Sequence, residues 1–380
     1  MSDTLINQIN RRSISTQQFA SYLLKQYSLP SLDDAYKAAR LILLDAGEIT
    51  SRTKLDKVLV DIARQSGIII SKSLDEVTSE LGNFSVSEAA FSAELISDYS
   101  DAKIKVSAQD FVKSYVNKSI MSLESNNSSV SGVWSQFTGK NKSETVDIIK
   151  AAVTTGYSRN ETISQIIKRV KMSVNGVATN KINTLIRTGV QHYAQQANNA
   201  LRDDNLDVLD REYPITTWDS RRSVTCTSLE AKYGVNGSTS KGWPVGKSPV
   251  GYPVYHYGCR TIVRAVPKGV KLEGERPAIT GVKGEEGKEA FERKEKLADK
   301  RLENGGSGVV KYTGRKDNAF KPELIKVDTK LSKFLRDQPT WYTEKLLGKT
   351  KSDAFRSGKI DLSQLTDKNL KPLTIEQLDL

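Results

Sequence analysis

The stretch "VYHYGCRTIVRAV" (residues 254–266) decides how the second half of this 380-residue chain folds. Its end is rich in β-branched residues, as is "REYPITTWDS" (residues 211–220) upstream, and this composition is typical of strands. The segment between them, residues 233–253, is rich in Gly and Pro and is expected to be mostly loop. The sequence therefore predicts a small antiparallel sheet packed on the helices that precede it.

Helical patterns fill the sequence before this sheet. Apolar residues recur at spacings of three and four in "DDAYKAARLILLDAG" (residues 33–47) and "TKLDKVLVDIARQ" (residues 53–65). We therefore expect a helical N-terminal region over residues 1–135, with a polar Ser- and Asn-rich linker at about residues 122–132. The predicted fold class is α+β and mostly helical.

A second region is expected over residues 136–267, opening with a helical hairpin. Gly156 is a residue that readily closes a helix, and Ser158 with Glu161 has the S-x-x-E spacing of a capping box at the start of the next one. A turn is expected at "SVNG" (residues 173–176), followed by a longer helix with apolar residues at helical spacing over residues 182–201. The small sheet completes this region.

The remaining chain divides into two further parts. Residues 268–320 are dense in Gly, Lys and Glu and predict a linker with one charged, solvated helix. Residues 321–380 recover apolar periodicity and predict a helical C-terminal tail. The chain starts without the apolar run of a secretory signal, and its apolar stretches are shorter than the roughly 18 residues of a membrane span. We expect synthesis in a reducing cytoplasm and no membrane-spanning segment.

The formal charge of +12 and the pI near 9.4 indicate a polyanionic partner or neighbour. Clustered Lys and Arg side chains gain free energy by displacing counterions from phosphates, so DNA is compatible with this composition. Total charge does not identify a site, however, because many basic proteins bind no nucleic acid.

One group of residues has side chains that could bind a metal or take part in catalysis, namely Cys226, His256 and Cys259, with Asp219 upstream. Thiolate, imidazole and carboxylate are ligands of zinc, but only H-x-x-C is a closely spaced pair, which leaves Asp219 or His192 as the fourth ligand. Two buried, reduced cysteines are the alternative. A Cys–His nucleophile is a third interpretation, although no cysteine-hydrolase signature surrounds either cysteine.

Three motifs occur in order along the second region. The helix "IRTGVQHYAQQANNALRD" (residues 186–203) carries an arginine–threonine pair, "TTWDSRRSVTCTSLEA" (residues 216–231) contains D-x-R-x-x-x-x-C-x-x-L, and "PVYHYGCR" (residues 253–260) contains P-x-x-H-x-x-C-R. Taken together they resemble the minor head proteins of tailed bacteriophages, the phage Mu protein F-like or head morphogenesis family. The matching positions are Arg187, Thr188, Asp219, Arg221, Cys226, Leu229, Pro253, His256, Cys259 and Arg260.

The chain departs from the family pattern at three positions. Gly189 stands where the family commonly has an acidic residue, Ala231 where it has glycine, and Thr261 where it has a second cysteine. The last change removes one candidate metal ligand. Within the resemblance, Asp219 and the Cys/His residues are expected to form a structural clasp that holds the long loop against the sheet.

The resemblance implies a structural protein rather than an enzyme. Such a protein binds the phage portal inside the capsid in few copies, lies beside packaged double-stranded DNA, and in some cases leaves with the genome. The expected location is the virion interior near the portal, and the host cytoplasm during assembly, with major capsid or scaffold proteins as further candidate partners. Two alternatives stay open: a toxin-like or hydrolytic enzyme built on the clasp, and a non-specific DNA-binding protein.

Overall fold

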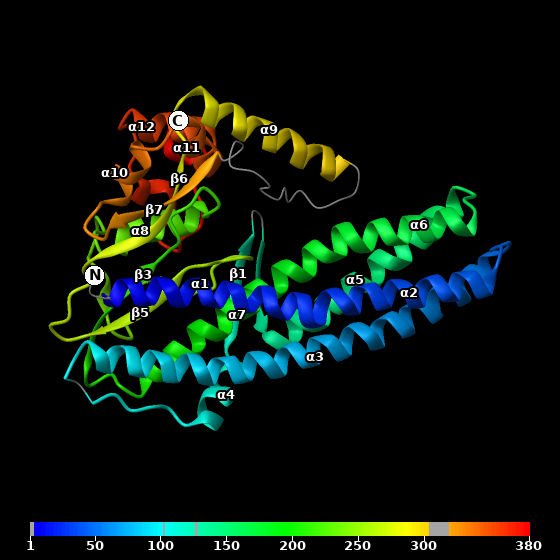
Figure 1. Ribbon diagram of the computed structural model, residues 1–380, viewed down its shortest axis with the longest axis horizontal. Helices are drawn as coiled ribbons and strands as arrows, with labels where there is room; N and C mark the ends of the chain where they lie inside the picture. Colours follow the sequence, from blue (N-terminus) through cyan, green and yellow to red (C-terminus); the bar gives the residue numbers. More distant parts are fainter. Residues whose placement is uncertain (1–3, 102, 126–127, 304–318) are drawn as a thin grey trace.

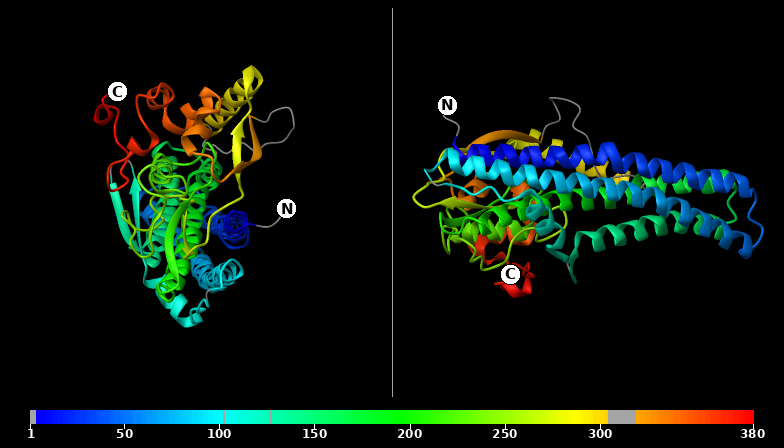
Figure 2. Two further views of the ribbon diagram at one scale, coloured as in Figure 1. Left: turned by 90° about the vertical axis from the view of Figure 1, so that its left-hand side faces the viewer. Right: turned by 90° about the horizontal axis from the view of Figure 1, so that it is seen from below.

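A computed structural model describes residues 4–101, 103–125, 128–303 and 319–380. Long helices lie side by side and give the molecule an elongated shape, while strands β3, β5, β6 and β7 and the short C-terminal helices gather at one end (Figure 1, Figure 2). The N-terminal helix begins at that same end. The mostly helical α+β class predicted from the sequence is confirmed.

The described part of the N-terminal region up to residue 118 consists of helices joined by short segments, as expected. Helix α1 (Leu5–Leu23) passes through a π-helical turn, η1 (Leu24–Ser28), into α2 (Leu29–Ala46), so that the two form one rod. Helix α3 (Arg52–Asp98) returns antiparallel to it and begins at Ser51, whose side chain accepts a hydrogen bond from the Lys54 amide. The short α4 (Gln109–Lys118) follows.

The prediction of a polar linker at about residues 122–132 is wrong. Strands β1 (Ile120–Ser125) and β2 (Ser128–Val133) form an antiparallel hairpin there, with Leu123 opposite Val130. Met121 and Leu123 alternate with polar residues and are buried, which is the period-two pattern of a strand with one face in the core. The abundance of Ser and Asn concealed this alternation.

Helices α5 (Trp134–Ser158) and α6 (Ile163–Ser173) form the expected helical hairpin, but two details differ. The capping box uses Thr162 and Gln165, because Ser158 is still inside α5 and Glu161 pairs with Arg169. No turn occurs at residues 173–176, since the π-helical turn η2 (Val174–Ala178) carries α6 directly into α7 (Thr179–Asp203). Asn175 and Gly176 are therefore accommodated inside a helix rather than in a turn.

Four helical rods share one apolar core, namely α1–α2, α3, α5 and α6–α7. Trp134 of α5 lies against Tyr193 of α7, and its indole nitrogen donates to the Thr78 hydroxyl of α3 at 2.8 Å. Buried residues from both sides of position 135 belong to this cluster, among them Ile62, Leu81, Ile149 and Ile186. The long helices of the N-terminal region are thus packed directly on those of the second region.

The predicted sheet is confirmed. Strands β3 (Leu209–Ile215), β4 (Trp243–Pro244) and β5 (Ile262–Pro267) are antiparallel in the order β4-β3-β5. The sheet is fastened to α7 by Gln195, whose side chain donates to the Val263 carbonyl and accepts from the Val263 amide. Helix α8 (Val224–Tyr233), which carries Cys226 and precedes the long loop, was not predicted from the sequence.

The charged linker expected over residues 268–320 contains more than a helix. Strand β6 (Glu275–Gly281) precedes helix α9 (Gly284–Glu303) and pairs with β7 (Phe320–Lys326), and residues 304–318 of that interval lie outside the described ones. The tail predicted to be helical over residues 321–380 begins with strand β7 instead. Its helices follow as α10 (Leu331–Arg336), α11 (Thr340–Leu347) and α12 (Lys349–Arg356), then the short 3-10 turns η4 (Leu362–Leu365) and η5 (Glu376–Leu378). None of the described helices combines the length and apolar character that a bilayer crossing requires.

Candidate metal centre

The first turn of α8 positions Cys226. Ser223 caps the helix, and its hydroxyl accepts a hydrogen bond from the Cys226 amide at 3.0 Å. This cap places the cysteine side chain on the face of α8 that looks toward the loop before β5. Leu229, one turn further on, is fully buried in the main core and anchors the helix.

A tight turn in the loop before β5 supplies the other two side chains. The Cys259 amide donates to the His256 carbonyl at 3.1 Å, and Gly258 between them has φ of 70°, a left-handed conformation that glycine adopts without strain. The Gly258 amide donates to the Thr188 hydroxyl of α7 at 2.9 Å, which fixes the turn on that helix. The Nδ1 atom of His256 donates to the Tyr257 carbonyl, so that Nε2 faces Cys226.

Cys226, His256 and Cys259 come together, with their ligand atoms all within 4.8 Å of one another. The two sulfur atoms are 3.9 Å apart, close to the roughly 3.8 Å between thiolates on one tetrahedral zinc ion. The Cys226 Sγ–His256 Nε2 distance of 3.1 Å is shorter than the roughly 3.6 Å that the same ion needs, so binding requires a small shift of the imidazole. These three residues could hold a metal ion.

Two hydroxyl groups contact the cluster. The Thr261 hydroxyl donates to Cys226 Sγ at 2.9 Å, and the Ser223 hydroxyl lies 2.8 Å from His256 Nε2. Asp219 and His192, the two fourth ligands considered from the sequence, are not members of the cluster. Thr261, at the position of a second cysteine in the pattern that the motifs resemble, thus contacts the cluster directly.

The two thiols are strongly coupled. The hydrogen bond with Cys259 raises the pKa of Cys226 to about 12, and burial adds to this effect. Burial raises the pKa of Cys259, but the hydrogen bonds from Cys226 and from backbone amides outweigh it and lower that pKa to about 7. Cys259 is therefore the more readily ionised of the two thiols.

Asp219 serves a different purpose from metal binding. Arg260 clamps its carboxylate with two hydrogen bonds of 2.5 and 2.7 Å, and an Arg221 nitrogen lies 3.7 Å from it. Burial raises the pKa of Asp219, but Arg260 and Arg221 lower it by more than this, so the net pKa lies below its ordinary value and the carboxylate stays charged. The Asp219–Arg260 pair ties the start of the α8 segment to the end of the loop that carries His256 and Cys259.

A buried ion cluster beneath α8 was not predicted from the sequence. Glu230, which is 5% exposed, receives Arg222 at 2.8 Å and also pairs with Arg276 of β6. Burial raises the pKa of Glu230, but Arg276 and Arg222 hold it below its ordinary value. Arg276 lies in the segment interpreted as a linker, so no sequence signal connected it to α8.

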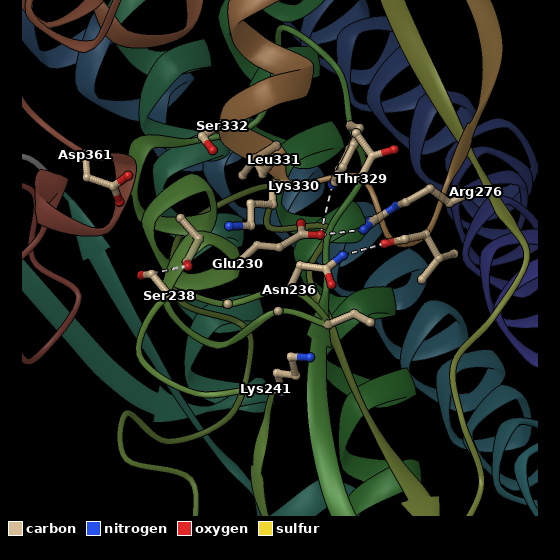
Figure 3. Close-up of a pocket in the computed structure, with 16 residues that line it drawn as sticks. Glu230, Asn236, Ser238, Lys241, Arg276, Thr329, Lys330, Leu331, Ser332 and Asp361 are labelled. Carbon is tan, nitrogen blue, oxygen red and sulfur yellow. Dashed lines mark hydrogen bonds and ion pairs between the residues drawn. The ribbon is translucent and has the colours of Figure 1, made fainter. Parts of the chain in front are cut away.

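This ion cluster borders a cavity of about 560 Å³ (Figure 3). Glu230 and Arg276 point toward each other at its wall, and Asn236 closes one side by donating to the Val327 carbonyl at 2.7 Å. Neither cysteine lines this cavity, and the Cys226 side chain is 3% exposed. A substrate in the cavity would therefore not reach the thiol.

Comparisons of the chain with protein-family models, with curated proteins and with solved structures found no match. The function is accordingly inferred from the residues and their arrangement.

Proposed function

We propose that this chain is a tailed-phage minor head protein of the phage Mu protein F-like kind, with a structural rather than a catalytic role. The observation that carries the proposal is the meeting of three separate motifs at one place. Thr188 of α7 holds the turn at Gly258, and the same turn brings Cys259 to Cys226 of α8. Residues that fit the family pattern in sequence are thus also neighbours in space.

In this role the chain binds the portal inside the capsid and lies beside packaged DNA, with major capsid or scaffold proteins as further partners. It is assembled in the host cytoplasm and is a candidate for ejection with the genome. The distribution of charge supports a phosphate-rich neighbour for the second region: residues 136–267 contain 18 Lys and Arg against 10 Asp and Glu, whereas residues 1–135 contain 14 against 16.

Zinc is the metal that suits the three side chains best, because two thiolates and one imidazole are borderline-soft ligands. Cys226, Cys259 and His256 Nε2 would hold it, and the bound ion would link the first turn of α8 to the loop before β5. This makes the centre a structural clasp. No step of catalysis is assigned to it.

Co-sedimentation with the portal ring of the same phage tests the assignment. We expect stoichiometric co-migration at low and moderate salt, with about one zinc per chain in the same fraction, measured by elemental analysis. A variant with Cys226→Ser and His256→Ala should lose the zinc. Absence of the protein from portal rings and from purified virions would contradict the minor head role.

An enzyme is the second candidate, because Cys226 Sγ lies 3.1 Å from His256 Nε2, within reach for a nucleophile and its base. The pKa of about 12 for Cys226 and its burial count against an activated thiolate. If any turnover is found, Cys226→Ala and His256→Ala should each abolish it. Activity that survives both changes would remove this assignment.

A further inference from the structure

Two arginines share a single carboxylate beside the clasp. Arg260 and Arg221 share Asp219, and Arg221 reaches into solvent, with its side chain 78% exposed. The Asp219 carboxylate is only 4% exposed and points inward to Arg260. It can neutralise one guanidinium group fully, so that Arg221 retains most of its positive charge at the surface.

Arg187 joins this group from helix α7. The Gly258–Thr188 hydrogen bond and a bond from the Gln191 side chain to the Thr261 carbonyl, 2.9 Å each, press that face of α7 against the loop that ends in Arg260. Thr188 follows Arg187 directly in α7, and Gln191 lies about one turn after it. The two motifs therefore bring Arg187 and Arg260 to adjacent surfaces.

Arg187 has no acidic partner among the described residues. Its guanidinium donates to the Asn183 and Gln17 side-chain oxygens at 2.9 and 3.2 Å, and to the Ser21 hydroxyl at 3.3 Å, all of them neutral. Burial lowers the pKa of Arg187, and the positive charges of Arg221 and Arg260 lower it further. In the described residues the Nε2 amide of Gln17 is also buried without an acceptor.

A cluster of three guanidinium groups and one carboxylate has two positive charges in excess. A half-buried guanidinium without a counter-charge is costly, and an oxyanion would relieve that cost by accepting hydrogen bonds from more than one of these side chains. A phosphate group meets this requirement, because the planar fork of arginine matches two of its oxygens. The partial exposure of Arg221 leaves the cluster open to a group that approaches from solvent.

We infer that Arg187, Arg221 and Arg260 form a binding site for a phosphate group of the double-stranded DNA backbone. The choice of DNA rests on the proposed function, whereas the phosphate chemistry rests on the arginines alone. Contacts of this kind position a protein on DNA without reading its sequence. A protein inside a filled capsid would contact the packaged genome at this site.

The test compares Arg187→Gln and Arg221→Gln with Arg64→Gln, which removes the same charge from an exposed site on α3. Binding of a 20-base-pair duplex is followed by fluorescence anisotropy between about 50 and 200 mM salt. We expect each cluster variant to weaken binding several-fold and to reduce the slope of log affinity against log salt by about 0.9, the loss of one phosphate contact. The control should keep the slope of the unmodified protein.

Arg260 is left intact because it also holds Asp219, and far-UV circular dichroism checks that each variant is folded. Equal slopes for both cluster variants and the control would overturn the DNA site. In a second arm, inorganic phosphate should raise the melting temperature of the unmodified protein and of Arg64→Gln but not of the cluster variants. Phosphate stabilisation without a change in duplex binding would reject DNA and assign the site to a small phosphate. Portal co-sedimentation is measured separately, so failure of the minor head role is distinguishable from either result.

Discussion

Thr261 lies against the candidate metal centre and contacts one of its thiols. Its hydroxyl lies 2.9 Å from Cys226 Sγ, and the residue is 1% exposed, so Thr261 is in direct, buried contact with the cluster. In the phage family that the motifs resemble, a second cysteine follows the C-R pair at this position. With Thr261 the candidate ligands are two thiols and one imidazole, and a hydroxyl lies beside them.

Thr261→Cys should therefore complete a Cys₃His set and tighten zinc binding by at least about tenfold, because a third thiolate replaces a hydroxyl. Competition with a chromophoric chelator measures the affinity. Thr138→Cys, which adds a thiol on α5 away from the cluster, is the matched control and should change nothing. Equal affinities for the two variants would show that position 261 does not face the ion.

His192 is a fully buried residue of α7, and burial lowers its pKa from 6.5 to about 4. Between these values the unfolded chain binds a proton and the folded chain does not, so stability falls as the pH drops from 6.5 to 4. The loss amounts to at most about 3 kcal/mol. Urea unfolding at several pH values, in chelator, should show a flatter dependence for His192→Leu than for the unmodified protein; identical curves would contradict this.

At the scale of elements, the sequence predicted helices and strands where the periodicity was strong and local. The helices from residue 5 to 118 and strands β3 and β5 followed from apolar spacing and β-branched residues. The β1–β2 hairpin was missed because Ser and Asn dominate its composition, and η2 because Asn and Gly usually end helices. Strand β6 has no distinctive composition, and its partner β7 lies about forty residues away, so its pairing depends on tertiary structure.

Helix packing also explains Gly189, which stands where the related pattern has an acidic residue. A Cβ atom at this position would overlap the buried ring of Trp134, which the Thr78 hydrogen bond holds in place. Gly189→Ala should therefore destabilise the protein by about 1–3 kcal/mol, although alanine favours helix. Gly67→Ala on α3, where nothing lies within 4 Å, should instead stabilise it by up to about 1 kcal/mol. Denaturant unfolding of both variants distinguishes a packing limit from a helix-propensity effect, and stabilisation by Gly189→Ala would refute the packing argument.

The whole molecule is joined by contacts between segments that are distant in the sequence. Glu88 of α3 is fully buried and receives Arg12 of α1 at 2.6 Å and Arg264 of β5 at 2.5 Å. No sequence pattern announces such a pairing, because its partners are separated by 76 and 176 positions. The metal cluster was partly predictable, since H-x-x-C is local, but the contribution of Thr261 required the fold.

The shared core and the Glu88 cluster lead to a prediction about cooperativity. Because α3 packs on α5 and α7 in one apolar cluster, residues 1–135 and 136–267 should unfold together rather than as two domains. Far-UV circular dichroism reports mainly on the long helices. The fluorescence of Trp134 reports on the core between the two regions, once Trp218, Trp243 and Trp341 have been replaced by Phe so that Trp134 is the sole tryptophan. The two urea transitions should coincide. Loss of helix signal before the Trp134 signal changes would instead indicate a separately folding N-terminal region.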